Sequence, residues 1–206
     1  MRPIYHITHF ENLVSMVNQG GICCDSIEIA GSLATVDIAH ENIKVRRRNR
    51  RVNVGPLGTL ADYAPFYFAP RSPMLNAIHN DAVEGYTDGQ NPIVHLVVYV
   101  EDIVASSIPF VFTDGHAEME VSGQFTDITD LQKIDWEVMG ARYWVSTNAD
   151  PGRKQRRQAE FLVYQICPWD LIKEIGVINS QVQAQVIAVL GQFSKPPITI
   201  HKDWYY

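Results

Sequence analysis

The sequence predicts a mixed α+β domain, because several short apolar strand patterns are interspersed with a few amphipathic helices. The clearest strand is the nearly continuous apolar run at 92–100 (PIVHLVVYV), which is typical of a strand buried on both faces. The clearest helix has apolar residues spaced three and four apart over 9–19. With 206 residues the chain can bury a sizeable core without disulfides, and we expect one domain over 1–206.

Helix starts are marked by capping residues. Thr8 and Glu11 have capping-box spacing, and Ser72 stands directly before Pro73, a favoured first helical residue. Ser180 is the expected cap of the last helix. The expected helices are 9–19, 72–80, 131–139 and 180–193, and the segment 37–51 could also be helical.

Strands are predicted where apolar residues alternate or run together between turn residues. In the aromatic run PFYFAP, Tyr67 alternates with Phe66 and Phe68, so its side chain could face a cleft while theirs face the core. The polar stretch 146–158 contains Pro-Gly and is expected to be an irregular loop. The expected strands are 3–8, 65–70, 92–100, 109–116, 160–166, 174–178 and 197–206.

Positive charge is concentrated in two short segments of an otherwise acidic chain. The formal net charge is −6, yet 44–51 (KVRRRNRR) holds six cations and 153–157 (RKQRR) holds four, which is ten of the 17 Lys and Arg. A local positive surface on an acidic body attracts a polyanion at one place only. The sequence therefore favours a confined nucleic-acid or phosphate contact.

Several classes of protein are disfavoured by what the sequence lacks. It has three cysteines without metal-ligand spacing, so we expect neither a disulfide framework nor a metal site. The same cysteines lead us to expect a reducing, cytoplasmic compartment. The N-terminus has no long apolar stretch, and no membrane span is expected. Neither a glycine-rich dinucleotide motif nor a phosphate loop is present.

Glu160 and His6 are the residues most open to a functional interpretation. Glu160 opens an apolar strand directly after a cationic loop, which would keep its carboxylate ionised, although a glutamate at a strand edge is ordinarily just solvated. His6 interrupts the strand IYHIT and could equally be a hydrogen-bonded core histidine. No nearby histidine or cysteine pairs with His6, which argues against a metal role.

Six segments in order resemble the DarT family of bacterial DNA ADP-ribosyltransferase toxins. They are IYHIT, RRNR, YAPFYFAPRSPML, PFVFTD, QAEFLVY and the terminal KDWYY, and they cover almost the whole chain. The resemblance implies an ADP-ribosyltransferase-like split β-sandwich with peripheral helices and an NAD cleft between two sheets. It also implies transfer of ADP-ribose from NAD, as co-substrate, to N3 of thymine in single-stranded DNA.

The resemblance also assigns roles to individual residues. Glu160 corresponds to the family's catalytic glutamate and Arg48 to its catalytic arginine. As a guanidinium, Arg48 is a poor base, so Glu160 is the first choice to remove the N3 proton, although the choice between them stays open. The expected NAD-binding residues are His6, Ile7, Thr8, Ser15, Cys23, Arg48, Tyr67 and Ser72.

The DNA contacts implied by the resemblance lie mainly around the loop 146–158, which corresponds to the superfamily's substrate-recognition loop. The expected DNA-binding residues are Arg47, Arg50, Arg71, His116, Arg153, Lys154, Arg156 and Arg157. Phosphate contacts of this kind provide affinity without reading sequence. The family's partner is a macrodomain antitoxin, DarG, which would be a separate chain here. Two alternatives stay open: an ADP-ribosyltransferase acting on RNA or protein, and a non-catalytic nucleic-acid-binding module.

Overall fold

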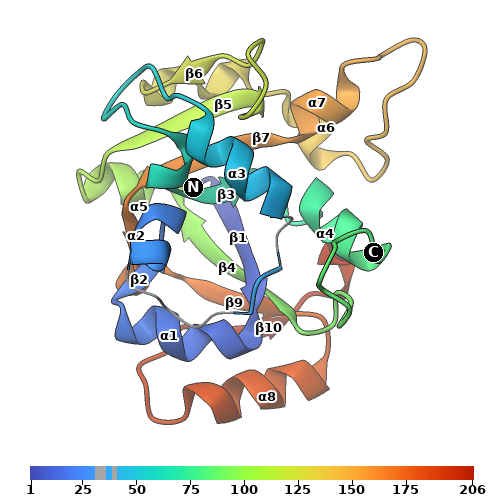
Figure 1. Cartoon of the computed structure of the whole chain (residues 1–206). Helices are drawn as coiled ribbons and strands as arrows, with labels where there is room; N and C mark the ends of the chain where they lie inside the picture. Colours follow the sequence, from blue (N-terminus) through green and yellow to red (C-terminus); the bar gives the residue numbers. More distant parts are fainter. Residues whose placement is uncertain (31–35, 39–40) are drawn as a thin grey trace.

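The computed structural model describes residues 1–30, 36–38 and 41–206, so part of the expected helix at 37–51 lies outside the described residues (Figure 1). One mixed sheet runs through the molecule, and a two-stranded sheet pairs β2 (Gly21–Cys23) with β8 (Ile166–Pro168). In spatial order the large sheet contains β10 (Ile198–Ile200), β9 (Glu174–Val177), β4 (Ile93–Tyr99), β1 (Pro3–His9), β3 (Tyr63–Tyr67), β7 (Ala159–Tyr164), β5 (Phe110–His116) and β6 (Gln124–Phe125).

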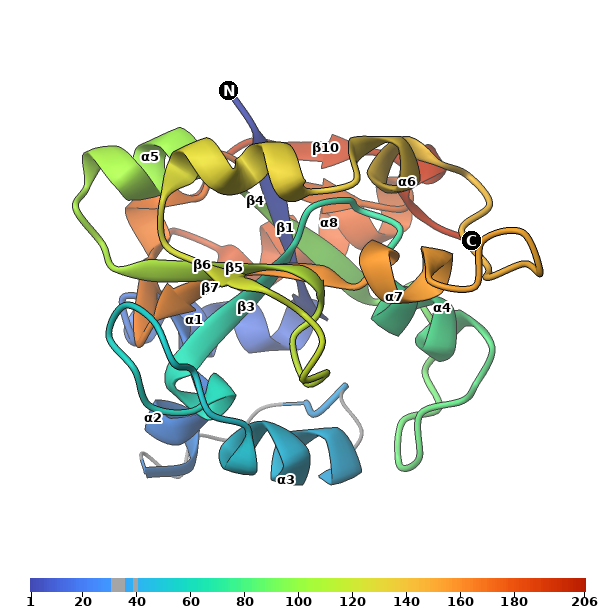
Figure 2. The ribbon, with the colours of Figure 1, turned by 90° about the horizontal axis from the view of Figure 1, so that it is seen from above.

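Helices cover the sheet on both sides. Figure 2 shows α2 and α3 on one side of the strands and α5 and α6 on the other, and α1 packs against α8. The helices are α1 (Leu13–Asn18), α2 (Asp25–Ala30), α3 (Glu41–Asn49), α4 (Pro73–His79), α5 (Val100–Ala105), α6 (Trp136–Gly140), α7 (Arg153–Arg157) and α8 (Ser180–Leu190).

The sheet divides between β1 and β3. β1 and β4 are in register over seven pairs, from Pro3–Tyr99 to His9–Ile93, and β3 and β7 over five pairs. In contrast, the described register between β1 and β3 consists of the single pair Tyr5–Tyr67. The predicted α+β class with peripheral helices is confirmed, whereas the two sheets implied by the resemblance are joined through this pair into one eight-stranded sheet. The gap between β1 and β3 leaves room for side chains to form a site.

Buried aromatic residues hold the strands around this gap. Phe66, Phe112 and Phe161 are fully buried, and the rings of Phe112 and Phe161 stack 6.2 Å apart. Burying such a side chain contributes about 1.5–3 kcal/mol. Because β7 is anchored by Phe161, Leu162 and Val163, all fully buried, the start of this strand occupies a fixed position.

Some predicted element boundaries are wrong, for local reasons. Thr8 stays in β1, and the helix at 9–19 begins as a 3-10 turn whose cap is His9, where Nδ1 accepts from the backbone of Glu11. The cap of α8 is Asn179 rather than Ser180. The start of α4 is as predicted, since Ser72 Oγ accepts from the backbone of Leu75.

Two expected absences concern only the described part of the chain. In that part, no helix is long and apolar enough to cross a membrane. The same residues contain no group of three His, Cys, Asp or Glu side chains placed to hold a metal ion.

Candidate active site

A cavity of about 320 Å³ lies where β1, β3 and β7 meet. The ends of these strands form its floor, and α2, α3, α4 and the segment 36–38 enclose it. Its polar and charged lining comes from widely separated parts of the sequence. These residues are His6, Thr8, Asn12, Asp25, Glu28, Asp37, Lys44, Arg47, Tyr67, His116, Glu118, Lys154, Gln158 and Glu160.

A buried ion pair joins β7 to α3 inside this cavity. Arg47 Nη1 donates to Glu160 Oε2 at 2.8 Å, and the two residues are 9% and 5% exposed. Burial alone would lower the pKa of the Arg47 guanidinium, but the Glu160 carboxylate reverses this effect and the pKa is raised. Removing one partner of such a pair leaves an uncompensated buried charge, at a cost of about 3–5 kcal/mol. Arg47 Nη2 is buried and has no hydrogen-bond partner among the described residues, so it can still donate.

Tyr67 lies directly opposite Glu160 in the register of β3 and β7. Its side chain lines the cavity, whereas Phe66 and Phe68 are buried in the core, which confirms the predicted alternation. Burial, reinforced by the Glu160 carboxylate, raises the pKa of the Tyr67 phenol. Tyr67 therefore stays neutral and offers an aromatic face next to the ion pair.

His6 bridges the gap between the two strand groups. Its Nδ1 lies 2.9 Å from the carbonyl oxygen of Pro65, and because a carbonyl only accepts, Nδ1 carries the proton. Burial lowers the pKa of His6, although the bond to Pro65 opposes this shift, so the ring is neutral at pH 7 with Nε2 as an acceptor. His6, Ile7 and Thr8, which the resemblance assigns to NAD binding, all line the cavity.

Sequence reasoning missed the opposite wall, which Asn12 and α2 build. Asn12 Oδ1 accepts from the backbone of Val36 at 2.6 Å, and its Nδ2 donates to the Val36 carbonyl at 3.0 Å, so one amide holds this segment over the cavity. Asp25 and Glu28 add acidic groups, and burial raises the pKa of Glu28 to about 7. The spacing of Asn12 four residues after Thr8, to which it also donates, was the available signal.

The arginine beside Glu160 is Arg47, and not Arg48 as predicted. Successive helical residues point about 100° apart, so three adjacent arginines on α3 cannot all face Glu160. Arg46 Nε turns to Glu118 at 2.7 Å, Arg47 faces Glu160, and Arg48 is exposed. The motif RRNR does not show which of its arginines faces Glu160, because the packing of α3 sets how the helix is rotated about its axis.

Two other expected cavity residues have local structural roles. Ser15 and Ser72 are absent from the cavity lining. Ser15 Oγ accepts from the Gln19 side chain at 2.6 Å, and Ser72 is the cap of α4. Cys23, by contrast, lines the cavity.

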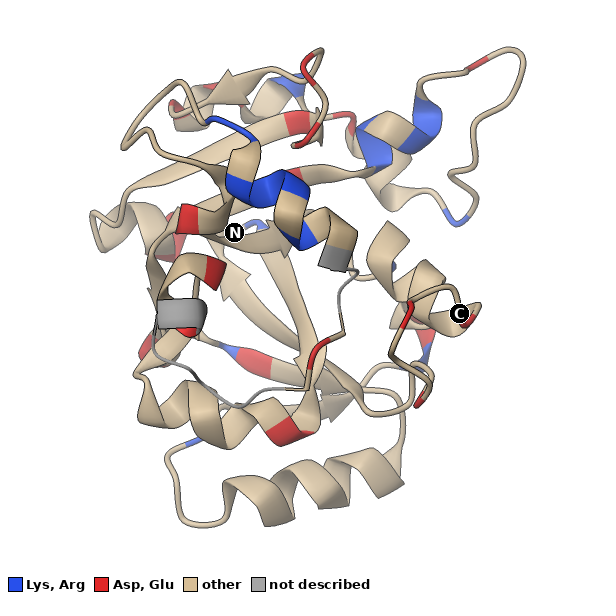
Figure 3. Cartoon of the chain, viewed as in Figure 1, with Lys and Arg blue, Asp and Glu red and all other residues tan. Residues whose placement is uncertain are grey.

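An open groove of about 940 Å³ continues from the cavity, and the two share part of their lining. Figure 3 shows the Lys and Arg residues gathered on α3 and α7 at the same end of the molecule. Arg50, His116 and Lys154, three of the predicted DNA-binding residues, line the groove. The residues that line both spaces are His116, Glu118, Lys154 and Gln158.

Most other cations predicted to bind DNA are engaged within the protein. Arg157 is 3% exposed, and its guanidinium donates to the carbonyls of Val138, Met139 and Arg71. Burial lowers the pKa of Arg157 to about 10, so it keeps its charge at pH 7.

The remaining two arginines of α7 and Arg71 are also paired. Arg156 pairs with Asp135 at 2.8 Å and with Asp150 at 2.7 Å, while Arg153 Nη1 lies 3.7 Å from Asp150. The Arg71 guanidinium stacks 4.3 Å from the centre of the Tyr206 ring. Within α7, Lys154 is therefore the cation directed into the groove.

Comparison with known proteins identifies the family. The family model described as "ssDNA thymidine ADP-ribosyltransferase, DarT" matches residues 5–206. A DNA ADP-ribosyl transferase of Thermus sp. (strain 2.9) is 42% identical over 208 residues, covering 99% of this chain and 96% of that protein. A relative from Thermosipho africanus, named as a fusion of a DNA ADP-ribosyl transferase with a DNA ADP-ribosyl glycohydrolase, is 25% identical over 199 residues, covering 96% of this chain and 48% of that protein.

Two solved structures of the Thermus sp. 2.9 protein have the same fold. Its complex with ADP-ribosylated single-stranded DNA superposes with a TM-score of 0.93 at 41% identity, covering 100% of this chain and 96% of that one. Its complex with NAD⁺ has a TM-score of 0.88 at 38% identity, covering 100% and 98%. This chain therefore belongs to the DarT family of single-stranded-DNA thymidine ADP-ribosyltransferases.

Proposed function

We propose that this chain transfers ADP-ribose from NAD⁺ to N3 of a thymine in single-stranded DNA and releases nicotinamide. The observation that carries this assignment is the buried Glu160–Arg47 pair in a cavity that continues into a groove lined by cations. The family membership and the Thermus sp. complexes with NAD⁺ and with ADP-ribosylated DNA support it. Residues 1–206 act as one transferase domain, with 146–158 as its substrate-recognition loop.

In this proposal NAD⁺ occupies the enclosed cavity. Glu160 accepts hydrogen bonds from the ribose hydroxyls next to nicotinamide, and the unpaired Nη2 of Arg47 donates to a phosphate or a ribose oxygen. Tyr67 stacks on nicotinamide, and His6, Ile7 and Thr8 hold the adenosine-side ribose and the nicotinamide amide. Cys23 lies toward the adenosine end. The cavity thus fixes the sugar–nicotinamide bond next to the ion pair.

The chemistry follows from the charge that develops on the ribose. As the bond between C1′ and nicotinamide breaks, C1′ gains positive charge, which the buried Glu160 carboxylate stabilises. The thymine N3 must lose its proton as it bonds to C1′. The raised pKa of Arg47 keeps this guanidinium protonated, so it cannot be the acceptor. We therefore propose a carboxylate as the acceptor of this proton.

The groove receives the DNA strand. Arg50 and Lys154 supply positive charge for the phosphates, and His116 stands where the groove meets the cavity. Base pairing in a duplex occupies N3 and keeps the base inside the stack, so an unpaired strand is the expected substrate.

A competition between acceptors tests this function. The protein is incubated with NAD⁺ and separate pools of single-stranded DNA, RNA and protein, and products are analysed by mass spectrometry. We expect one ADP-ribose on thymine and release of an equal amount of nicotinamide. Labelling confined to RNA or protein would move the function to those acceptors. DNA binding without nicotinamide release would indicate a non-catalytic binding module.

A DNA-modifying toxin requires an antagonist, and we propose a macrodomain antitoxin as the partner. The Thermosipho africanus relative, in which transferase and glycohydrolase are fused, supports this pairing. Access to NAD⁺ and DNA, together with three free cysteines, supports a cytoplasmic location.

A further inference from the structure

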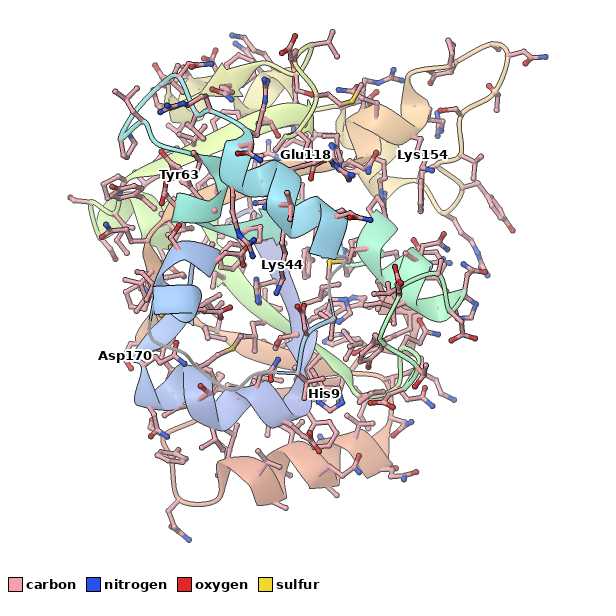
Figure 4. The ribbon with its side chains drawn as sticks, in the orientation of Figure 1. His9, Lys44, Tyr63, Glu118, Lys154 and Asp170 are labelled. Atoms are coloured by element: carbon pink, nitrogen blue, oxygen red, sulfur yellow. The ribbon has the colours of Figure 1, made fainter. Side chains whose placement is uncertain are left out.

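Glu118 is a buried carboxylate at the junction of the cavity and the groove. It lies in the turn between β5 and β6, and its side chain is only 10% exposed. It lines the cavity together with Glu160 and Tyr67, and it lines the groove together with Lys154. Figure 4 shows Glu118 between α3 and Lys154. A base that enters the cavity from the groove must pass this side chain.

One oxygen of Glu118 is fixed and the other is unpaired. Oε2 accepts from Arg46 Nε at 2.7 Å, which sets the orientation of the carboxylate. Oε1 is buried and has no hydrogen-bond partner among the described residues. A buried acceptor without a donor costs about 1–3 kcal/mol, and more when it is charged. The arrangement suits a donor that arrives with the substrate.

Three other carboxylates of the cavity and Tyr67 are poor candidates for the proton. Glu160 already accepts from Arg47 and is needed at the ribose. Tyr67 holds its own proton, because burial and Glu160 raise its pKa. Asp25 and Glu28 line the cavity from α2 but do not line the groove. Glu118 therefore offers a free acceptor on the side from which the DNA comes.

We propose that Glu118 accepts the N3 proton of the target thymine, an inference that rests on the function proposed above. The proton moves from N3 to Oε1 of Glu118, and the N3 electron pair forms the bond to C1′ of the ribose. The bond between C1′ and the nicotinamide nitrogen breaks, and its electron pair neutralises the pyridinium, so neutral nicotinamide leaves. Atoms and charge balance without a further reactant.

The same contact selects the base. Thymine and uracil present a donor, N3–H, to the Glu118 oxygen, whereas N3 of cytosine carries a lone pair and no hydrogen. Two acceptors would then face each other in a buried site, which disfavours cytosine strongly. Glu118 is thus a catalytic residue that also determines specificity.

The test compares Glu118→Gln with Glu84→Gln. The Glu84 side chain is exposed and lines neither the cavity nor the groove, so its substitution removes the same charge without touching the junction. For Glu118→Gln we expect kcat on a single-thymine oligonucleotide to fall about 100-fold or more, the usual contribution of a general base. Its activity should rise with pH as the thymine imide ionises without help. Glu84→Gln should keep the wild-type kcat and pH profile.

The controls separate this idea from the proposed function and from a structural role. Glu118→Asp retains the charge with a shorter reach and should also lose kcat, and melting curves check that each variant folds. A Glu118→Gln enzyme within about threefold of wild type would overturn the proposal. So would a loss of activity with a wild-type pH profile, which would indicate a structural role or Glu160 as the acceptor. A wild-type enzyme that modifies no thymine would instead refute the function itself.

Discussion

Helices α3 and α7 carry the chain's two clusters of cations, and the two helices use them differently. On α3, Arg46 and Arg47 each contact one carboxylate of the cavity, Glu118 and Glu160. On α7, Arg157 is buried on backbone carbonyls, and Arg156 pairs with Asp150 of its own loop and with Asp135, the cap of α6. The α3 arginines set the charges of the site, and the α7 arginines set the shape of the loop 146–158. Similar composition therefore conceals different functions, and the hydrogen-bond partners of the arginines tell them apart.

The largest effect on kcat is expected at Glu160, the carboxylate that Arg47 of α3 contacts. Glu160→Gln removes the charge that stabilises the developing ribose cation, so kcat should fall about 100- to 1000-fold. Arg47 would become an uncompensated buried cation, which should also lower the stability. The measurement is nicotinamide release with DNA present, with chemical denaturation in parallel. Wild-type turnover in a folded Glu160→Gln protein would contradict the role.

The corresponding change in α7, Arg157→Met, should mainly lower the stability of the fold. Arg157→Met leaves the carbonyls of Val138, Met139 and Arg71 without their donor, and we expect a loss of about 3 kcal/mol in the free energy of unfolding. Urea unfolding measures it. A variant as stable as wild type but deficient in DNA binding would show that Arg157 acts on DNA, as the sequence suggested.

His95 supports the same turn that Arg157 holds, and it makes stability depend on pH. Its Nε2 donates to the Pro70 carbonyl and Nδ1 faces Tyr205 Oη, and burial lowers the pKa of His95 from 6.5 to about 4. As the pH falls, His95 is protonated at a higher pH in the unfolded chain than in the folded one. The stabilisation from neutral His95 is therefore complete above pH 6.5 and is lost as the pH falls towards 4, a change of about 3 kcal/mol in the free energy of unfolding.

The measurement is urea unfolding between pH 7 and pH 4. Stability should fall less steeply in His95→Phe than in wild type, and the exposed His79 provides the control, since His79→Gln should follow wild type. Equal slopes in all three proteins would contradict the assignment to His95.

The smallest effect is expected at the one α7 cation in the groove. Lys154→Ala should weaken binding of single-stranded DNA of any sequence and lower the slope of log K against log salt by about 1. Lys202→Ala, which removes an exposed cation outside the groove lining, should change neither. Titrations at several salt concentrations measure both variants. An unchanged slope in Lys154→Ala would remove Lys154 from the DNA path.

The sequence predicted those site features that depend on local pattern. The alternation at Tyr67, the Ser72–Pro73 helix start and the strand that begins near Glu160 follow from periodicity and capping. It could not predict that Arg47 rather than Arg48 faces Glu160, because the phase of α3 depends on how that helix packs.

Two further features depend on tertiary contacts that leave no local trace. A run such as RKQRR predicts an exposed surface, and only the carbonyls of α6 and Arg71 explain why Arg157 is buried. Glu118 stands in a turn with no motif. Its proposed role follows from its position where the cavity meets the groove, and both are built by segments distant in the sequence.

The most direct test of the account compares two adjacent arginines of α3. Arg47→Lys and Arg48→Lys keep the charge and differ only in which side of the helix changes. We expect about 100-fold less thymine modification for Arg47→Lys, because a lysine cannot reproduce the guanidinium geometry at Glu160, and activity within twofold of wild type for Arg48→Lys. The reverse result, with Arg48→Lys inactive and Arg47→Lys active, would contradict the assignment of the catalytic pair.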